Sequence, residues 1–146
     1  MRRRSGFTLI EMMIVLAIIA ALAATLVPIA MNALNQAKVT GNLTDVESIR
    51  MAEMQYWYKY DTTTASKTAL DIYLTWANLQ APNNSTYNLT VPGTGTTSNQ
   101  ISIGVNFGSA ALAKAFEAQF PTESPDVVSF TRPDDSEVAT VTYQFQ

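Results

Sequence analysis

The strongest constraint on this chain is an uncharged, apolar run near its amino terminus. No charged side chain occurs between Met12 and Ala37. A helix that crosses a membrane needs about 20 mostly apolar residues, and this run reaches that length only if the helix continues past Pro28. Proline either ends a helix or kinks it, and the helix-compatible residues 29–38 make a kinked continuation as well supported as a stop.

Glu11 needs an explanation, because a carboxylate drawn into an apolar run opposes insertion into lipid by up to about 2.5 to 3.5 kcal/mol. A secretory signal peptide, cleaved at the small residues 21–23, and a plain single-span anchor both leave Glu11 unexplained. A third interpretation cuts the chain between Gly6 and Phe7. The new amino group would neutralise Glu11, four residues along the helix, in the same chain or in a neighbouring copy. A pair between copies would set the axial register of an assembly.

A specific motif precedes the apolar run: residues 6–11 are Gly-Phe-Thr-Leu-Ile-Glu, behind three arginines. This pattern resembles the type IV prepilin signal, which type IV pilins, type II secretion pseudopilins and competence pilins share. The resemblance implies that a membrane aspartyl peptidase, the prepilin peptidase, removes the leader after Gly6 and methylates the amino group of Phe7. It also implies an assembly role for Glu11 and local melting of the helix at Pro28 when a filament stretches.

The resemblance divides the chain into a leader peptide at residues 1–6, a hydrophobic transmembrane or filament-core helix at 7–36, and a globular pilin head at 37–146. Apolar residues at helical spacing extend the first helix to about Tyr60; they are Val39, Leu43, Val46, Ile49 and Tyr56. Alternating apolar residues then predict two hairpins, the first around a loop at 92–97. The expected helices are 66–80 and 109–120, the second stopped by Pro121, and the expected strands are 87–91, 100–107, 127–130 and 137–145.

These elements predict an α+β, pilin-like fold, with a long N-terminal helix and a small antiparallel β-sheet packed on its C-terminal half. The composition excludes much familiar site chemistry. The 146 residues contain no His and no Cys, which rules out disulfides, thiolate metal sites and Ser-His-Asp or Cys-His catalysis. No catalytic residue, cofactor site or metal site is predicted, and the chain is not expected to be an enzyme. A group of carboxylates offers oxygens that suit calcium, but solvated turn residues are the favoured interpretation; the group is Asp126, Asp134, Asp135 and Glu137.

The charge balance argues against nucleic-acid binding. Without the three leader arginines, six of the nine basic residues face twelve acidic ones, and a phosphate-binding surface needs a basic patch. The aromatic stretch at 54–61 could stack bases, but with only Lys59 nearby and Asp61 beside it, core packing is favoured. Four asparagines begin Asn-x-Ser/Thr triplets and could accept glycans; they are Asn42, Asn83, Asn84 and Asn88.

Three functional hypotheses follow. The favoured one is a structural subunit of a type IV pilus, processed by prepilin peptidase and assembled through its apolar helix into an extracellular filament for motility, adhesion or DNA uptake. The alternative is a pseudopilin of a type II secretion system, and the third is a membrane-anchored or exported domain of unrelated function. The resemblance implies three partners besides the membrane: further copies of the chain, the peptidase and an inner-membrane assembly platform. The precursor would cross the bacterial inner membrane once, with a cytoplasmic amino terminus; the product would lie outside the cell, or in the periplasm for a pseudopilin.

Overall fold

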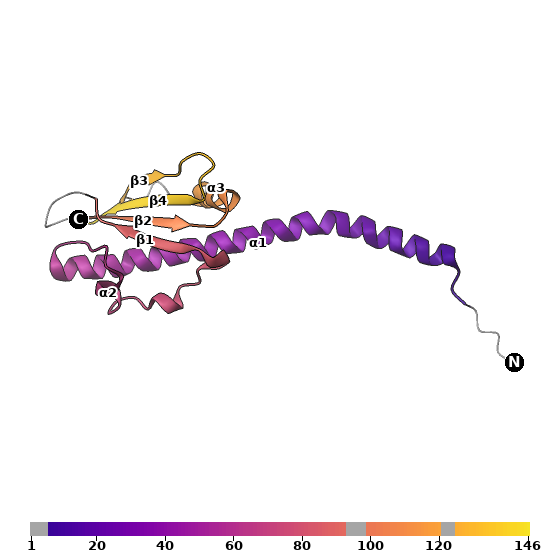
Figure 1. Cartoon of the computed structure of the whole chain (residues 1–146), viewed down its shortest axis with the longest axis horizontal. Coiled ribbons are helices and arrows are strands. Elements are labelled where there is room, and N and C mark those ends of the chain that lie inside the picture. The colour runs from indigo at the N-terminus through magenta and orange to yellow at the C-terminus, as the bar shows by residue number, and fades with distance from the viewer. Residues whose placement is uncertain (1–5, 93–98, 121–124) are drawn as a thin grey trace. The chain divides into compact units, whose positions relative to one another are not determined.

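The computed structural model describes residues 6–92, 99–120 and 125–146 of the chain (Figure 1). The chain divides into two compact units, Met1–Leu34 and Asn35–Gln146, with the boundary inside the first helix. The elements, in order, are α1 (Leu9–Tyr60), α2 (Lys67–Leu70), the 3-10 turns η1 (Trp76–Asn78) and η2 (Pro82–Asn84), β1 (Thr86–Thr90), β2 (Gln100–Asn106), α3 (Ala110–Gln119), β3 (Val127–Thr131) and β4 (Val138–Gln144). The leader arginines, most of the expected hairpin loop at 92–97, and Pro121 lie outside the described residues.

Helix α1 continues through Pro28, so the alternative that proline ends it is wrong. A proline inside a helix removes one backbone hydrogen bond, while the turns on either side can still form. The residues that flank Pro28 favour helix strongly enough for this to happen. One turn before the proline, the Thr25 hydroxyl donates to the carbonyl oxygen of Leu22 at 2.9 Å, so this polar side chain is satisfied by its own helix.

The second half of α1 presents one face to the core of the second unit. The predicted apolar positions are all buried or half-buried, which confirms the amphipathic pattern. Three polar side chains on the same helix are also buried, and the pattern did not predict them: Asn42, Asp45 and Glu53. Buried polar groups normally need hydrogen-bond partners. We therefore expect the segments that pack around α1 to supply donors or acceptors to these three side chains.

The sheet is antiparallel, with the strand order β1-β2-β4-β3. Both predicted hairpins are confirmed, and β2 and β4 pair at the centre, where Ile103 lies opposite Val141. Alternate residues on these two central strands, and the residue after each, point into the core as the period-2 pattern predicts; they are Ile101, Ile103, Val105, Phe107, Ala139, Val141, Tyr143 and Phe145.

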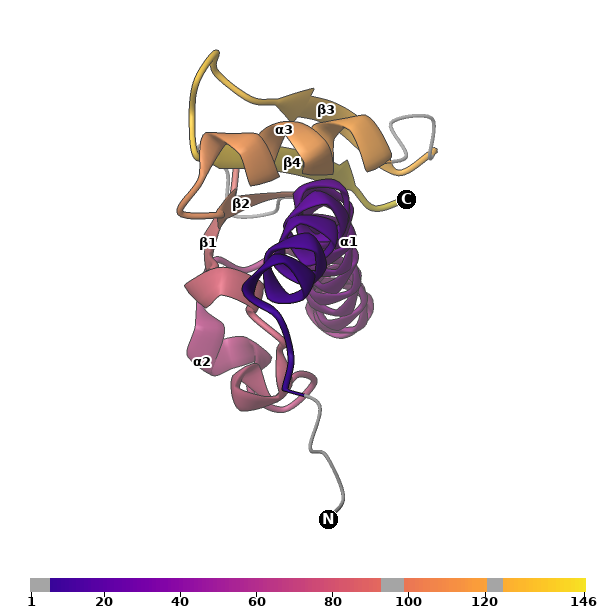
Figure 2. The same cartoon turned by 90° about the vertical axis from the view of Figure 1, so that its right-hand side faces the viewer.

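Within the second unit the sheet lies along one side of α1, and the segment with α2 lies along another (Figures 1 and 2). Helix α3 brings Phe116 to the sheet, where its ring centre lies 5.0 Å from that of Phe107 and 6.2 Å from that of Phe130. The fold is therefore α+β and pilin-like, with a long N-terminal helix and a four-stranded antiparallel sheet, as predicted.

The helix predicted at residues 66–80 is wrong beyond Leu70. Ser66 caps α2, accepting a hydrogen bond from the Ala69 amide at 3.4 Å. The chain then leaves the helix. Farther along, the Asp45 carboxylate on α1 accepts hydrogen bonds from the amides of Gln80 at 2.9 Å and Ala81 at 2.8 Å, a tertiary contact that the local helical pattern does not contain.

Replacing Gly41 tests how closely the segment with Gln80 and Pro82 approaches α1. A Cβ at Gly41 would lie 2.7 Å from Pro82 Cγ and 3.0 Å from Gln80 Oε1. We expect Gly41→Ala to lower the free energy of unfolding by about 1–3 kcal/mol through overpacking, although alanine favours a helix by about 1 kcal/mol over glycine. The measurement is urea unfolding of the full chain in detergent micelles, followed by circular dichroism.

Gly104→Ala is the matched control, because the nearest atom to a Cβ there is the Asn88 carbonyl oxygen at 3.6 Å, an ordinary contact. This substitution should change stability by less than about 1 kcal/mol. Equal stability of the two variants would contradict the close approach of Pro82 to α1.

Candidate functional site

The start of α1 is built around a reciprocal contact between Thr8 and Glu11. Glu11 Oε2 accepts hydrogen bonds from the Thr8 amide at 2.7 Å and from the Thr8 hydroxyl at 2.8 Å. The Glu11 amide in turn donates to Thr8 Oγ1 at 3.3 Å. This is a capping box, in which the residue before the helix and the third helical residue satisfy backbone N–H groups that have no partner within the helix.

The capping box gives Glu11 a role that the sequence interpretation missed. The signal was present, because Thr8 and Glu11 have the Thr-x-x-Glu spacing of the motif. A negative charge in the first turn is also favoured by the helix dipole. The carboxylate therefore has partners in its own chain before any amino group is released nearby.

One oxygen of the carboxylate stays available for a second partner. Both hydrogen bonds from Thr8 use Oε2, and within the described part of the chain Oε1 receives none. A single carboxylate can accept several hydrogen bonds through its two oxygens. Glu11 can therefore keep its capping role and still bind a cation through Oε1.

The predicted cleavage position lies just before this box, in a stretch without regular structure. Gly6 and Phe7 precede the first helical residue, Leu9, and Phe7 is 82% exposed. No atom lies within 4 Å of a Cβ built on Gly6. The Gly6–Phe7 peptide bond is thus sterically accessible, as a bond that is to be hydrolysed must be.

The apolar part of α1 is exposed along its described length. Every described residue from Gly6 to Leu34 is exposed, including Leu9 at 79%. Among the described residues one helix, α1, is long and apolar enough to cross a membrane by length and composition, with a mean hydropathy of 2.7 over its most apolar window. Pro28 lies within this part of the helix, and the structure does not bring it together with Glu11.

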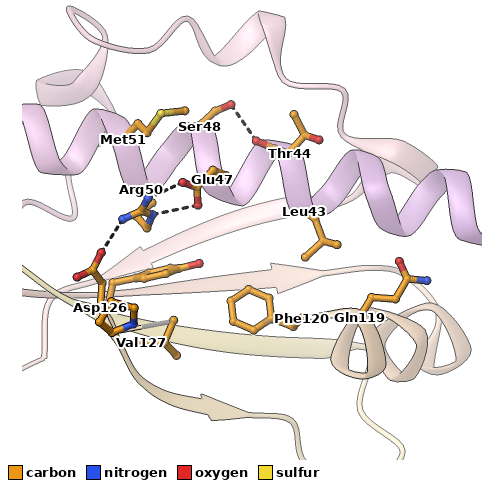
Figure 3. A pocket seen from close by; sticks show the side chains of 12 residues that line it. Leu43, Thr44, Glu47, Ser48, Arg50, Met51, Gln119, Phe120, Asp126 and Val127 are labelled. Atoms are coloured by element: carbon orange, nitrogen blue, oxygen red, sulfur yellow. Dashed lines mark hydrogen bonds and ion pairs between the residues drawn. The ribbon is translucent and has the colours of Figure 1, made fainter. Parts of the chain in front are cut away.

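The second unit has a cavity of about 640 Å³ between α1, the end of α3 and the start of β3 (Figure 3). Arg50 lies at its edge and binds Glu47 and, at 3.0 Å, the Asp126 carboxylate. The hydrogen bond from Arg50 to Glu47 raises the pKa of the Arg50 guanidinium above its ordinary value. Both carboxylates are thereby committed to one cation, and the rest of the lining is largely apolar, with Leu43 and Phe120 facing the same hollow.

The remaining candidate sites of the second unit can now be placed. Among residues 6–92, 99–120 and 125–146, no three His, Cys, Asp or Glu side chains are grouped so that they could hold a metal ion. Asp126 pairs with Arg50, while Asp134, Asp135 and Glu137 are exposed.

Two of the four asparagines that could accept glycans are exposed, Asn84 and Asn88. Asn42 is fully buried, and its side-chain oxygen accepts a hydrogen bond from the Tyr87 hydroxyl at 2.9 Å. In the folded protein Asn42 is therefore not accessible for attachment of a glycan. The Asn83 side chain lies outside the described part of the chain.

The aromatic stretch at the end of α1 packs only in part. The Trp57 ring centre lies 6.1 Å from that of Phe145, and the Tyr56 ring meets Tyr73 edge-on at 6.4 Å. Tyr58 and Tyr60, by contrast, are 73% and 49% exposed. Core packing is thus the correct interpretation for the first pair and not for the second.

Replacing Thr8 tests the capping box. Thr8→Val keeps the shape and the backbone amide but removes the hydroxyl, and loss of such a cap costs about 1 kcal/mol. We expect amide hydrogen exchange at Glu11 and Met12 to become about fivefold faster in the full chain in micelles. Thr8→Ser restores the hydroxyl and should exchange at the native rate, so equal rates in the two variants would contradict the contact.

Residues 1–27 match the family described as the prokaryotic N-terminal methylation motif. Type II secretion system core protein G of Pseudomonas aeruginosa is 47% identical over 55 residues, which are 38% of this chain and 39% of that protein. The matched segment thus spans about two fifths of that curated relative, and no solved structure matches the chain. The first residues of this chain therefore carry the N-terminal methylation motif, the signal of type IV pilins and pseudopilins.

Proposed function

We propose that this chain is a structural filament subunit of the type IV pilin or pseudopilin kind, and that it assembles through the apolar half of α1. One observation carries the proposal: the methylation motif at residues 1–27 runs into an apolar helix, and every described residue from Gly6 to Leu34 is exposed. Apolar surface of this extent is unfavourable in water. Lipid would cover it in the precursor, and the helices of other copies would cover it in the filament.

The precursor would cross the inner membrane once. The three arginines before Gly6 keep the amino end on the cytoplasmic side, because positive charge is retained there. Prepilin peptidase would then cut the Gly6–Phe7 bond and methylate the new amino group of Phe7. The exposed, non-helical segment before Leu9 supports this step, since a peptidase needs an accessible, extended bond.

Assembly would use the unoccupied oxygen of Glu11. An ionisable group within lipid is costly and is normally paired. In the precursor Thr8 supplies part of the compensation through Oε2. After cleavage the amino group of Phe7, in the same chain or in the neighbouring copy, would bind Oε1. A pair between copies fixes their axial offset, and the apolar side chains of α1 supply the remaining contact.

Pro28 would serve the filament mechanically. Proline cannot donate the backbone hydrogen bond that a helix places at its position. The carbonyl one turn earlier, that of Ala24, therefore lacks its usual partner in the helix. This turn is the place at which α1 would unwind most readily when packed subunits stretch.

The two members of the proposed class differ in the machine that uses the filament. A type IV pilus subunit, major or minor, would form long surface fibres, with an inner-membrane platform assembling copies of the chain. A type II secretion pseudopilin would form a short periplasmic fibre, and the similarity to core protein G favours this alternative specifically. Electron microscopy of cells with and without the gene, combined with an assay of protein secretion, separates the two.

A membrane-anchored or exported domain of unrelated function is the third hypothesis. Within the described residues the cavity beside Arg50 offers no base and nucleophile in contact, because its two carboxylates hold Arg50. The proposal therefore treats the chain as a non-enzyme. Catalytic activity retained after deletion of residues 1–28 would favour the third hypothesis instead.

The mature amino terminus tests the processing step. We expect mass spectrometry of the assembled protein to find Phe7 as the first residue, with one methyl group on its amino nitrogen. Chains beginning at Ala24 would establish ordinary signal-peptide cleavage and overturn the proposal.

Glu11→Gln tests the charge at Glu11 separately from the cap, since glutamine also completes a capping box. Assembled filament should fall about tenfold or more, because each 1.4 kcal/mol lost from a subunit contact is a factor of ten. Unfolding of the second unit should not change. Glu137→Gln, at an exposed carboxylate outside α1, is the matched control and should assemble normally. Normal filaments from the Glu11 variant would remove the role assigned to its charge.

A further inference from the structure

Glu53 is a fully buried carboxyl group that has no cationic partner among the residues that the structure describes. Its side chain is 0% exposed on the core face of α1. Oε2 accepts the Thr64 amide at 3.2 Å, and Oε1 receives no hydrogen bond from the described residues. A buried carboxylate in this position is strongly disfavoured in its ionised form, whereas the neutral acid is tolerated.

The charged and titratable groups around Glu53 are committed to other contacts or exposed. On α1, Arg50 binds Glu47 and Asp126, and Lys59 lies over the Tyr60 ring. Asp45 accepts Gln80, Ala81 and Tyr87. On the segment after α1, Asp61 and Asp71 are exposed and Lys67 lies over Trp76. Strands β2 and β4 carry no charged side chain, and Tyr143 lies under Arg50.

The surroundings of Glu53 therefore act on it mainly by excluding water. Burial raises the pKa of the Glu53 carboxyl to about 7, and the hydrogen bond from the Thr64 amide opposes this shift. No charge interaction contributes to the shift. The neutral form thus prevails in mildly acidic surroundings, and ionisation sets in near neutrality.

The segment that Glu53 holds is anchored in the core by the fully buried Leu70, and the stretch before Leu70 is held by a few hydrogen bonds. Directly after α1 the chain turns at Asp61, whose φ of 54° lies in the left-handed region. The Thr63 hydroxyl donates to the Gln100 carbonyl oxygen on β2 at 2.7 Å, and Thr64 donates to Glu53. Farther along, the buried Tyr73 hydroxyl has no hydrogen-bond partner in the described structure. Two unsatisfied polar atoms thus occur where residues 61–73 lie against α1.

We propose that Glu53 is a proton-controlled latch for residues 61–73. The neutral carboxyl lets the segment stay closed on α1, and the ionised carboxylate draws in water and releases it. The sign follows from linkage: the closed state binds the proton more tightly than the open state, in which the ordinary pKa of 4.5 applies. Closure is therefore tightest below about pH 4.5 and weakens as the pH rises through about 7. This inference does not depend on the proposed function.

Amide hydrogen exchange of the full chain in micelles tests the latch. After correction for intrinsic exchange rates, protection of residues 61–73 should be about tenfold lower at pH 8 than at pH 6, because the closed state loses its proton-binding advantage over that interval. Residues 100–106 of β2 should keep their protection. Glu53→Gln, which is neutral at every pH, should make the protection of 61–73 independent of pH.

Glu137→Gln removes an exposed carboxyl and should leave the tenfold change intact. Equal corrected protection at both pH values in the native chain would overturn the proposal, and so would the same pH dependence in Glu53→Gln. Should that variant fail to fold, the carboxyl carbon of Glu53 in the native chain can be followed by nuclear magnetic resonance. A titration midpoint near 7 supports the latch, and one near 4.5 overturns it.

Discussion

An apolar helix that exposes its side chains must be covered by something outside its own chain, and this constraint governs the first unit. From Gly6 to Leu34 every described residue is exposed, although the sequence there is almost wholly apolar. Lipid can cover such a helix, and so can other copies of it. In the proposed function, lipid covers the helix in the precursor, and the helices of other copies cover it in the filament.

In the proposed assembly, the acid at the start of this helix would make the contact between copies specific. A purely apolar helix could slide along its neighbours, because apolar contacts have little directionality. Glu11 adds one directional group, and the capping box fixes where its carboxylate points. Thr8 occupies one oxygen and leaves the other, so the same side chain can stabilise its own helix and bind an amino group. The proposed assembly would thus use a geometry that is already present in the single chain.

Two acidic side chains among the described residues of the second unit are buried, unlike the exposed Glu11. Asp45 and Glu53 lie on the buried face of α1, but their surroundings differ. Asp45 is surrounded by donors: the amides of Gln80 and Ala81, and the Tyr87 hydroxyl at 2.6 Å. It therefore anchors the segment before β1 permanently. Glu53 has one donor and no cation, so the segment it holds responds to protons.

The sequence predicted the structure well where apolar residues recur with a strong period. The alternation in β2 and β4 and the helical spacing from Val39 to Tyr56 place apolar side chains on one face, and burial of that face is the main driving force. The helix expected at 66–80 was wrong beyond Leu70, and the amides at its expected end bind Asp45, a contact that no local pattern reveals. The burial of Asn42 and Glu53 was hidden for the same reason.

The sequence predicts the candidate site from residue types and spacing. The spacing of Gly6, Phe7 and Glu11 indicates the motif. The spacing of Thr8 and Glu11 also indicates the cap, but the sequence interpretation paired Glu11 with an amino group and did not include the cap. The proposed pairing of Glu11 with the Phe7 amine, in the same chain or in a neighbouring copy, needs the chain end that cleavage would create, and the precursor chain does not contain that end.

The central claim, that a released amino group binds Glu11 in the assembled state, can be measured directly. In filaments labelled with 15N at Phe7 and 13C at the Glu11 carboxyl, solid-state nuclear magnetic resonance reports the distance between these two atoms. The account predicts a separation of about 4 Å, as in an ion pair. A nearest separation beyond about 8 Å, at which the pair would contribute little, would contradict it.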